Sequence, residues 1–590
     1  MNLNNYKLIL FAFLFLIFNS CEDFLAKPPS VDKTVDVVFS NIQNAEEVLN
    51  AAYFLLPTGF TYLDQGAWNP HAGIYGGNVS LLSDEAEALS TPRQYAMGYN
   101  DATINSSTIY PFLEDKWPYH WSAIRSCYLY NENIGKVPNM TSEADKLFIK
   151  TRKGEAFAII GIKYFEMFKR YGGLPWMNKV YSPADVTNLA RLSAEATVDS
   201  IVSILDRAIA LLPVRYEQRD FGRITKVGAL AVKARLLVYA ASPLFNDNTT
   251  PMAFGLKELI CAPYKKERWD RAAKACKEVI TISEQNGYKL INTGNPRTDY
   301  KTAWRELDAN INTEVLLASR SRPQLKAQMY QRVKIFARKA YPGQYPAGIP
   351  SSQPTQNMVD LYEMQNPNAV KDPSNPYFGL DPRFYETILP QGSSWAGLFS
   401  IDFSVNKDNV NEILGNNNST GMQTGFCSGY ALAKFGYPEG EPSWQEFQIF
   451  WPYIRLSDIY LMYAEALNEF NSGPNTEAYY YLNEVRKRAG MSILSGLNYQ
   501  QTKDRIVNER AVELAFEQLR YWDLKRWKRL DILRGANYGI QVLKDKKTNA
   551  ITYQKFKATE RKFPENQYFW AFPLSEVLKS APKLIQNPGW

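Results

Sequence analysis

Residues 452–489 read PYIRLSDIYLMYAEALNEFNSGPNTEAYYYLNEVRKRA, and this stretch decides the fold. Apolar side chains recur at helical spacing before and after a turn of Asn, Ser, Gly and Pro at residues 471–475. The pattern therefore predicts two helices that face each other across a short connection. Their apolar stripes consist of Leu456, Ile459, Tyr460, Tyr463, Ala464 and Leu467 in the first helix, and of Ala478, Tyr481, Leu482 and Val485 in the second.

A helix pair of this length matches one tetratricopeptide unit, and the chain upstream predicts more of them. Apolar faces recur at helical spacing in residues 227–241 and 269–280. Longer helices are predicted over 117–135, 143–171 and 194–212, each closed or followed by Gly or Pro. We therefore expect a mainly α protein, built on a tetratricopeptide-like helix-pair scaffold that insertions interrupt.

The character of the sequence changes between residues 321 and 450. Pro, Gly, Asn and Ser dominate there, and no helical pattern persists beyond residues 356–364. A structureless loop of this length is uncommon in a compact domain unless it is functional. We interpret 321–450 as a large, irregular, loop-rich lobe with some short strands. It separates an N-terminal scaffold part at 21–320 from a C-terminal part at 451–590 that holds the last helix pair.

The composition is that of an ordinary globular protein with many aromatic residues. The 590 residues include 67 Lys or Arg and 60 Asp or Glu, and a net charge of +7 over this length gives no argument for a nucleic-acid partner. The chain has 37 Tyr, 31 Phe and 13 Trp, many of them in loop-like segments. Aromatic faces suit sugar rings, and the alternative is a large Tyr-rich core. Composition alone leaves both open.

Few residues are available for metal or thiol chemistry. Only two histidines occur, and neither lies in a recognisable partner motif, which disfavours a zinc enzyme or a His-based triad. Cys127 and Cys276 fall on predicted helices and are interpreted as buried thiols. With Cys261 and Cys427 they are irregularly spaced, so the disulfide state of all four stays open. No cofactor is predicted, and a structural calcium ion is left open.

The N-terminus predicts export from the cytoplasm. Lys7 precedes an unbroken apolar run at residues 8–18, and Asn19-Ser20 leads into Cys21. A cationic start, a short apolar core and a small residue before the cleavage point are typical of a secretory signal. The run is shorter than the roughly 20 residues that span a bilayer. Residues 1–20 are therefore interpreted as a signal peptide. The alternative is a signal that is cut elsewhere, with Cys21 incidental.

Cys21 directly after Ser20 resembles a bacterial lipobox, in which the Cys is lipidated and becomes the mature N-terminus. Motifs along nearly the whole chain, in the same order, resemble those of the SusD/RagB family of surface lipoproteins from Bacteroidetes-type bacteria. The most specific single motif is LRYWDLKRW at residues 519–527. The others are CEDFL at 21–25, SDEA at 83–86, WSAIR at 121–125, RYGGLP at 170–175, KVGALAVKARLLVYAASPLF at 226–245, PTQN at 354–357, DPRF at 381–384, YIRL at 453–456 and QNPGW at 586–590.

The resemblance implies a definite role. Members of the family are not enzymes. They are anchored by lipid, here through Cys21, on the exterior of the cell outer membrane, and they pair with a TonB-dependent, SusC-like transporter. Each captures a ligand, usually an oligosaccharide, and acts as a lid that delivers it for import. Four tetratricopeptide-like helix pairs form the scaffold, much of which faces the transporter, and insertions on the opposite side carry the ligand site.

Two motifs admit other interpretations. Residues 519–527 mix basic and aromatic side chains, which by itself suggests nucleic-acid binding. A helical stripe runs from Val512 to Trp522, however, so we interpret Trp522 as core and the charges as ion pairs across the scaffold, with little energetic weight at a surface. Asp84 and Glu85 are adjacent carboxylates. Neighbours in sequence point apart on a helix, whereas a glycosidase needs two facing carboxyls roughly 5–10 Å apart.

Ligand-contacting residues are predicted from loop position and residue type, because binding residues vary widely within the family. Aromatic side chains from loops, flanked by Asn or Arg, suit sugar rings and their hydroxyls. Trp395 is the first candidate, since it lies among Gly, Ser and Ala and has little local core to join. The full set is Trp68, Tyr75, Arg93, Tyr95, Tyr99, Asn100, Tyr341, Tyr345 and Trp395.

Three alternatives remain open from the sequence. One is a surface glycoside hydrolase. Another is a helical-repeat scaffold without a small ligand, against which the aromatic loops count mildly. The third keeps the fold but binds peptides or glycoprotein fragments, because aromatic clefts also hold peptide side chains. The identity of the sugar and the stoichiometry with the transporter are not determined.

Overall fold

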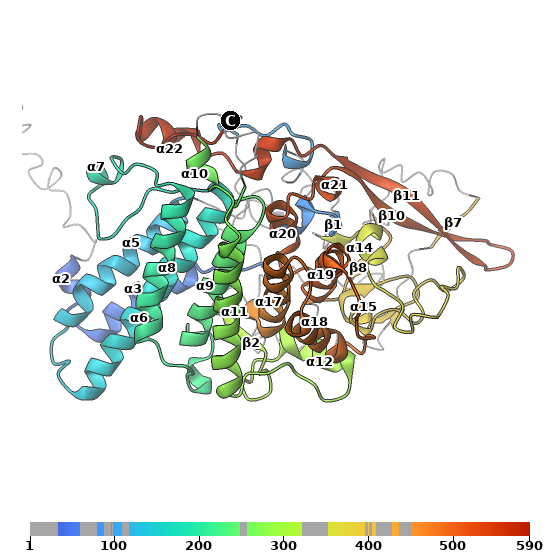
Figure 1. The fold of residues 1–590 in the computed structure, drawn as a ribbon, viewed down its shortest axis with the longest axis horizontal. Helices are drawn as coiled ribbons and strands as arrows, with labels where there is room; N and C mark the ends of the chain where they lie inside the picture. The colour runs from blue at the N-terminus through green and yellow to red at the C-terminus, as the bar shows by residue number, and fades with distance from the viewer. Residues whose placement is uncertain are drawn as a thin grey trace, which may run out of the picture.

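The structure is a computed structural model that describes residues 34–59, 79–87, 96, 98–108, 117–247, 256–320, 352–395, 399–400, 404–408, 428–435 and 450–590. Helices predominate, strands are mostly short, and the prediction of a mainly α fold is confirmed. Figure 1 shows a row of helices on the left and in the centre, with a less regular region on the right.

The row of helices forms the scaffold, and neighbouring helices pack side by side along it (Figure 1). Residues from both ends of the chain contribute, because α11 from the N-terminal half packs directly against α17 from the C-terminal half. The members, in chain order, are α3 (Ile42–Phe54), α5 (Trp117–Asn133), α6 (Glu143–Tyr171), α8 (Ala194–Leu211), α9 (Lys226–Ala241), α11 (Glu267–Gln285), α17 (Leu456–Asn471), α18 (Thr476–Arg488) and α19 (Tyr499–Glu513).

The ends of these helices have local causes. In α6, Ser142 accepts a hydrogen bond from the Asp145 backbone N–H while the Asp145 carboxylate accepts one from the Ser142 backbone N–H, which completes a capping box. The helix ends at Gly172, whose φ of +76° favours glycine. A Cβ there would also lie 2.9 Å from the Leu259 carbonyl oxygen, so the residue has no room for a side chain. Local sequence therefore sets both ends of the longest helix.

Shorter elements connect and flank the scaffold. The helical ones are α2 (Val35–Val38), η1 (Val79–Leu82), η3 (Ile134–Lys136), α7 (Pro183–Val186), η4 (Gln218–Asp220), α10 (Lys257–Ile260), α12 (Pro296–Arg305), α14 (Gln356–Asp360), α15 (Pro382–Thr387), α20 (Arg520–Arg526), α21 (Leu530–Leu533), η9 (Glu565–Tyr568) and α22 (Leu574–Lys579).

Short strand pairs occur in the irregular lobe, as the sequence predicts. Antiparallel pairing joins β4 to β8 and β5 to β6 within the lobe, β2 to β9 at its two borders, and β3 of the lobe to β1 outside it. Their bounds are β1 (Ala86–Glu87), β2 (Val315–Arg320), β3 (Gln353–Pro354), β4 (Ile388–Leu389), β5 (Ser394–Trp395), β6 (Phe399–Ser400), β8 (Ala431–Leu432) and β9 (Phe450–Arg455).

The longest strands lie outside that lobe, which the sequence analysis did not anticipate. Strands β10 (Gly535–Lys544) and β11 (Ile551–Arg561) form an antiparallel hairpin, and β7 (Val405–Asn406) pairs parallel to the end of β10. The hairpin projects at the right of Figure 1. Few of its side chains are both apolar and buried, chiefly Ile540 and Val542, so the sequence shows only a weak strand pattern.

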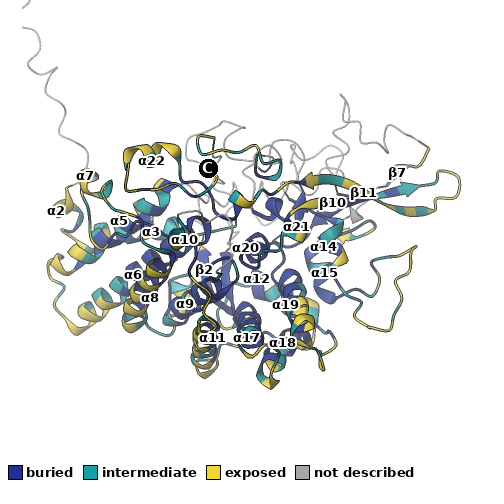
Figure 2. Ribbon diagram, turned by 45° about the horizontal axis from the view of Figure 1, so that its top comes forward, coloured by how far each residue is buried: buried dark blue, intermediate teal, exposed yellow. Residues whose placement is uncertain are grey.

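The stripe predicted from Val512 to Trp522 does not form one helix. Helix α19 ends at Glu513 and α20 starts at Arg520, and between them Phe516 and Gln518 take φ of +60° and +61°. Trp522 is 2% exposed, so its assignment to the core is confirmed. The core that includes it is one continuous cluster whose members run from Phe39 to Leu584, drawn in dark blue in Figure 2.

The charges of the 519–527 motif are not at the surface, which corrects the prediction of weak surface ion pairs. Arg520, Lys525 and Arg526 are buried. Arg526 donates to Glu465 Oε1 and Oε2 at 2.6 and 2.7 Å, and Arg520 pairs with Asp84. Partners of such buried cations lie far away in the chain, so sequence alone does not reveal them.

Candidate functional site

Most residues predicted to contact the ligand lie outside the described part of the chain. The six are Trp68, Tyr75, Arg93, Tyr95, Tyr341 and Tyr345, and the lipidation residue Cys21 lies outside it too. These assignments stay predictions. The remaining three candidates, Tyr99, Asn100 and Trp395, lie in described segments.

Trp395 lies on a short hairpin. Strand β5 pairs antiparallel with β6, so that Trp395 stands opposite Phe399 and Ser394 opposite Ser400. The residue two positions before β5, Gly392, has a φ of +80° and nothing within 4 Å of where a Cβ would be. The backbone of Trp395 is therefore held by strand pairing close to an open glycine turn.

Tyr99 and Asn100 are engaged by the protein itself. Tyr99 is 3% exposed, and its ring centroid lies 5.1 Å from that of Trp570. Its carbonyl oxygen accepts a hydrogen bond from Gln567 Nε2 at 2.7 Å. Asn100 is half-buried, and its Nδ2 donates to the Leu81 carbonyl at 3.0 Å. Both side chains attach their segment to the C-terminal part of the chain and to η1, and the Tyr99 ring offers almost no surface to a ligand in this structure.

The acidic motif at residues 83–86 belongs to a turn, residues 79–87, that is hydrogen-bonded to residues 516–520 of the C-terminal part. Arg520 donates from Nε and Nη2 to the two carboxylate oxygens of Asp84, both at 2.9 Å. The Glu85 carboxylate accepts from the Phe516 backbone N–H at 2.5 Å. Gln518 Oε1 accepts from the Val79 N–H at 2.8 Å. The left-handed backbone at residues 516 and 518 thus presents these groups to the turn.

A second set of contacts holds the same turn from the other side. Arg561 Nη2 donates to the carbonyls of Leu81 and Ala86, both at 3.0 Å, and lies 2.9 Å from Glu87 Oε1. Asn537 Nδ2 donates to Glu87 Oε1 at 2.8 Å. Hydrogen bonds and ion pairs therefore hold the buried residues 79–87 from two sides. The predicted ligand residues 68–75 and 93–95 precede and follow this segment in sequence.

The two adjacent carboxyls of this turn, Asp84 and Glu85, lie in different environments. Burial raises the pKa of Glu85 from its usual 4.5 to about 7, although hydrogen bonds from Phe516 and Ser80 oppose the shift. Asp84 is engaged by Arg520 in a bidentate ion pair. Both residues are buried, Glu85 at 1% and Asp84 at 6% exposure. One carboxyl in an ion pair and one against a backbone N–H do not form the facing pair that glycoside hydrolysis uses.

Arg455 of the YIRL motif lies at the centre of a buried ionic cluster. Its guanidinium nitrogens lie 2.5 Å from Glu314 Oε1, 2.9 Å from Glu513 Oε1 and 2.7 Å from Glu517 Oε1. Burial by itself raises the pKa of Glu513, but Arg488, Arg455 and Arg383 outweigh it and hold that pKa well below its usual range. The cluster ties the β2 border, β9 and α19 together and is closed to ligands.

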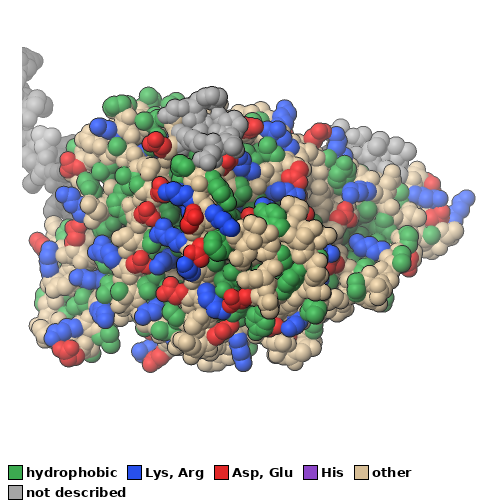
Figure 3. All heavy atoms as spheres, in the orientation of Figure 1, with side chains coloured by type: hydrophobic (Ala, Val, Ile, Leu, Met, Phe, Trp, Pro, Cys, Tyr) green, Lys and Arg blue, Asp and Glu red, His purple; other side chains and the backbone are tan. Residues whose placement is uncertain are grey.

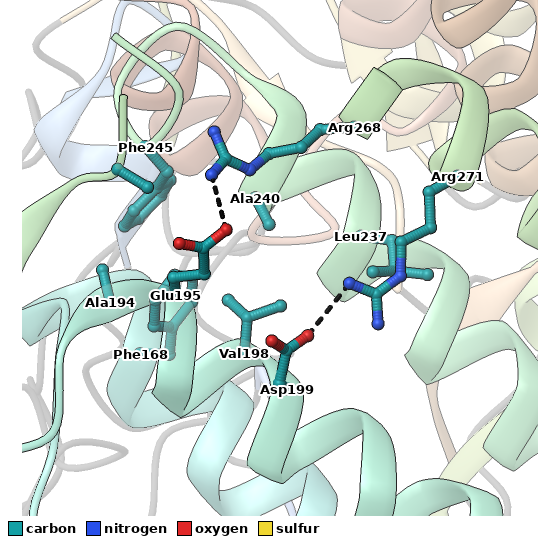
Figure 4. Close-up of a pocket in the computed structure, with 11 residues that line it drawn as sticks. Phe168, Ala194, Glu195, Val198, Asp199, Leu237, Ala240, Phe245, Arg268 and Arg271 are labelled. Carbon is teal, nitrogen blue, oxygen red and sulfur yellow. Dashed lines mark hydrogen bonds and ion pairs between the residues drawn. The ribbon is translucent and has the colours of Figure 1, made fainter. Parts of the chain in front are cut away.

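The scaffold carries a small cavity between α8, α9 and α11 (Figure 4). Its volume is about 40 Å³, and apolar side chains such as Phe168, Val198 and Leu237 line it. Two ion pairs lie at its edge in Figure 4, Arg268–Glu195 at 2.9 Å and Arg271–Asp199 at 3.0 Å. A drug-sized ligand needs roughly 300–1,000 Å³, so this cavity does not hold an oligosaccharide.

A wider depression of about 410 Å³ adjoins that cavity on the same helices. Charged side chains border it, including the ion pairs Lys233–Asp206 and Lys274–Asp270, at 2.7 and 2.6 Å, and none of its lining residues is aromatic. It lacks the flat apolar platform that sugar rings require. In the described segments the scaffold face therefore presents paired charges around a shallow hollow, which resembles a protein-facing surface more than a glycan site.

The described part of the chain has neither a metal-binding cluster nor a membrane-spanning helix. No group of three or more His, Cys, Asp or Glu side chains is placed there to hold a metal ion. Cys127 and Cys276 are buried thiols, as predicted, and burial raises the pKa of both well above the usual value. No helix among these residues has the length and apolar character needed to cross a membrane.

Comparisons with known proteins match both halves of the chain. The model described as "SusD family" matches residues 313–590, and the model described as "Starch-binding associating with outer membrane" matches residues 66–238. A SusD-like protein of Formosa agariphila is 22% identical over 89% of this chain and 91% of its own length.

Solved structures share the fold over nearly the whole length. A SusD-like protein from Bacteroides fragilis has a TM-score of 0.73 and 22% identity, covering 96% of this chain and 100% of its own. A SusD-like carbohydrate binding protein, also from Bacteroides fragilis, has a TM-score of 0.65 and 19% identity over 92% of this chain and 99% of its own. The two family models match the two halves of the chain, and the chain belongs to the SusD/RagB family.

Proposed function

We propose that this protein is a lipid-anchored binding protein of the outer membrane that captures oligosaccharide on the cell exterior and delivers it to a TonB-dependent transporter. The observation that carries the proposal is the match to the SusD family in both halves of the chain, over a fold shared with a protein described as carbohydrate binding. Binding would occur without covalent chemistry.

Attachment to the membrane is proposed through Cys21. One of the two matching family models is described as associating with the outer membrane. The sequence predicts a signal peptide that ends directly before Cys21. Several acyl chains on one residue hold a protein stably on a membrane, whereas a single chain is marginal.

The ligand side is proposed to lie at the loops around the turn at residues 79–87 and at the β5–β6 hairpin. Residues 79–87 are held against the body by Arg520 and Arg561, so this segment is a rigid base for the residues that precede and follow it in sequence. Rigid bases reduce the ordering that binding costs. Sites of this kind are open and wet, so we expect modest affinities.

The helix row is proposed to face the transporter. Its hollow between α8, α9 and α11 is rimmed by ion pairs with at least one exposed partner each, which charged groups of a partner protein can rearrange at little cost.

Purification of the native lipoprotein from outer membranes in mild detergent tests the import role. Mass spectrometry should identify a TonB-dependent barrel that co-purifies reproducibly. A protein that comes alone in several detergents would count against delivery to a transporter. Release of sugars from a polysaccharide panel by the pure protein would instead support the hydrolase alternative.

The position of the ligand side is tested by comparing the glycan affinity of Trp395→Ala with that of the control variant Tyr480→Ala. Tyr480 on α18 is 53% exposed and belongs to the helix row, so its loss removes an exposed aromatic ring away from the β5–β6 hairpin. Loss of a stacked ring is expected to weaken glycan binding by about 1–2 kcal/mol in calorimetry for Trp395→Ala, with no change for Tyr480→Ala. Equal affinities in the two variants and the wild type would remove Trp395 from the site.

A further inference from the structure

The β10–β11 hairpin, together with Arg534 and Lys562 on either side of it, has a net positive charge close to that of the whole chain. Residues 534–562 include eight Lys or Arg and two Asp or Glu, so their formal net charge is +6, against +7 for all 590 residues. The segment projects from the body at the right of Figure 1, and Lys and Arg side chains are visible along the same projection in Figure 3.

Five of the lysines in this segment are exposed. Lys546 and Lys547 lie in the connection between the strands, and their side chains make no ion pair within the described chain. On β11, Lys555 lies 3.0 Å from Asp360, and Lys557 lies 2.9 Å from Glu560. The side chains of both pairs are about half exposed. Such pairs contribute at most about 1 kcal/mol, so an incoming anion can compete with them. The fifth is Lys562, just after β11.

Aromatic rings alternate with these cations. Register places Tyr538 opposite Lys557 and Val542 opposite Tyr553, and side chains two residues apart share a face of a strand. Tyr538, Tyr553, Lys555 and Lys557 therefore lie on one face, which they share with the buried Ile540 and Val542. Tyr553 packs toward the body there, with its ring centroid 5.6 Å from that of Tyr377, whereas Lys555 Nζ is 4.7 Å from the centroid of the Tyr538 ring. Tyr538 and Tyr553 are both half-buried. The row from Lys557 to the turn spans about 20 Å at the usual rise per residue.

A structural explanation accounts for only part of this charge. Lysines on an exposed edge strand protect it from pairing with other chains, and β11 is the edge strand of its sheet. That explanation covers Lys555 and Lys557. It does not cover Lys546 and Lys547, which lie beyond the strands in the connecting turn.

We propose that the β10–β11 hairpin is a further glycan-binding surface, for polysaccharides that bear carboxylate or sulfate groups. The Tyr538 ring would pack against a sugar ring while the exposed lysines meet the acidic groups. The turn, residues 545–550, has no large apolar side chain to enter a bilayer, which favours a glycan over a lipid surface. The inference rests on the proposed glycan-binding function and adds the charge class of the ligand.

The test uses the full mature chain in neutral detergent and a matched pair of triple variants. One is Lys546→Gln, Lys547→Gln and Lys557→Gln on the hairpin. The control is Lys146→Gln, Lys274→Gln and Lys487→Gln, three exposed lysines on α6, α11 and α18. Each variant lowers the net charge by the same amount, so a difference in affinity between the two cannot come from the overall charge of the protein. Thermal melting confirms that both fold.

Calorimetry with polygalacturonate at low ionic strength should show binding to the wild type and the control, and about tenfold weaker binding to the hairpin variant. Added salt should weaken wild-type binding more steeply than that of the hairpin variant. Polyglutamate, which has carboxylates but no sugar rings, should bind more weakly than polygalacturonate.

Other outcomes would overturn the inference. Equal affinity of the two triple variants would show that the hairpin is not the site, and equal binding of polyglutamate would show that sugar rings are not recognised. Hairpin-dependent binding to anionic phospholipid vesicles, without binding to polygalacturonate, would assign the surface to lipid. Neutral polysaccharides measured in parallel separate the two proposals: if they bind while polygalacturonate does not, only this inference fails, and if no glycan binds, the proposed function fails.

Discussion

Arg455 and the carboxylates around it keep a large amount of charge away from water. Arg455 is 1% exposed, and Glu314 and Glu513 are fully buried. Taking ions out of water is costly, and their mutual attraction offsets the cost only when each has a well-placed partner. The stability of this cluster therefore depends on every member being present.

Removing the central cation should be strongly destabilising. In Arg455→Met, the facing carboxylates Glu314, Glu513 and Glu517 lose their shared partner, and we expect a loss of about 3–5 kcal/mol in the free energy of unfolding. Urea unfolding measures it. The control Arg219→Met removes an arginine that is 79% exposed beside Glu217, and should change the free energy by less than about 0.5 kcal/mol. Similar effects of the two substitutions would contradict the argument.

Glu85 gives the chain a pH dependence of definite sign. Its pKa rises from 4.5 to about 7 on folding because burial disfavours the charged form. Between those two values the folded chain holds a proton that the unfolded chain has released. The contribution of Glu85 to stability is therefore present below about pH 4.5 and is lost as pH rises through about 7.

Glu85→Gln should remove this loss, because the neutral amide still accepts a hydrogen bond from the Phe516 N–H. The free energy of unfolding of the variant, relative to wild type, is expected to increase on the order of 2 kcal/mol from pH 5 to pH 8. Chemical unfolding across that range measures the difference, with the exposed Glu217→Gln as control. A difference that is flat with pH would show that Glu85 does not titrate there.

The β10–β11 hairpin shows at the scale of elements how a distant loop fixes a strand. The backbone carbonyl oxygen of Ser428 accepts a hydrogen bond from the Ile540 N–H at 2.8 Å. The next residue, Gly429, has a φ of +79°. A Cβ at Gly429 would collide with the Ile540 carbonyl oxygen. Only glycine allows the loop to approach the backbone of β10 this closely.

Gly392 and Gly429 have nearly the same φ but different surroundings. Replacing each by alanine therefore distinguishes the cost of a steric clash from the cost of a left-handed backbone. Gly392 has a φ of +80° but open space around it. Gly392→Ala should cost about 1 kcal/mol, the usual penalty of a left-handed alanine. Gly429→Ala should lower the free energy of unfolding by about 2 kcal/mol more than Gly392→Ala does, because the backbone at Ile540 must move to make room for the methyl group. Thermal unfolding compares them, and equal costs would mean that the loop does not contact β10.

At the scale of the whole molecule, the helix row is assembled from both halves of the chain. Helix α11 packs on α17, and Arg235 of α9 pairs with Asp458 of α17, so the row joins two parts of the chain that are far apart in sequence. Residues between these helices in the chain, such as Tyr300 and Phe384, belong to the same hydrophobic core, so the row and the described part of the lobe are packed together.

Membrane attachment of the whole protein should depend on a single residue. Cys21→Ala removes the proposed lipidation site, so the protein is expected to leave the membrane fraction and to lose palmitate labelling. Cell fractionation with immunoblotting measures this. The control Cys276→Ala removes a buried thiol and should leave the protein in the membrane fraction. Retention of the Cys21 variant in membranes would point to another mode of attachment.

The sequence by itself determined the helices, because their signals are local. Caps such as Ser142, the stop at Gly172, and apolar residues at helical spacing act within a few positions, and the observed bounds of α6 agree with those predicted. The family motifs are also local features, and so is the pattern that predicts an export signal. For the candidate site, residue type and loop position could nominate residues such as Trp395 but could not distinguish a platform from core.

Only the tertiary structure decided which polar and aromatic residues are buried. Arg520 meets Asp84 across 436 residues, and Tyr99 packs on Trp570, so neither role is visible in the neighbouring sequence. The left-handed Phe516 and Gln518 interrupt an apolar stripe that reads as one helix, because their N–H and amide groups bind the distant 79–87 turn. Long-range contacts of this kind outweigh local propensity, which is the physical reason the sequence alone did not reveal them.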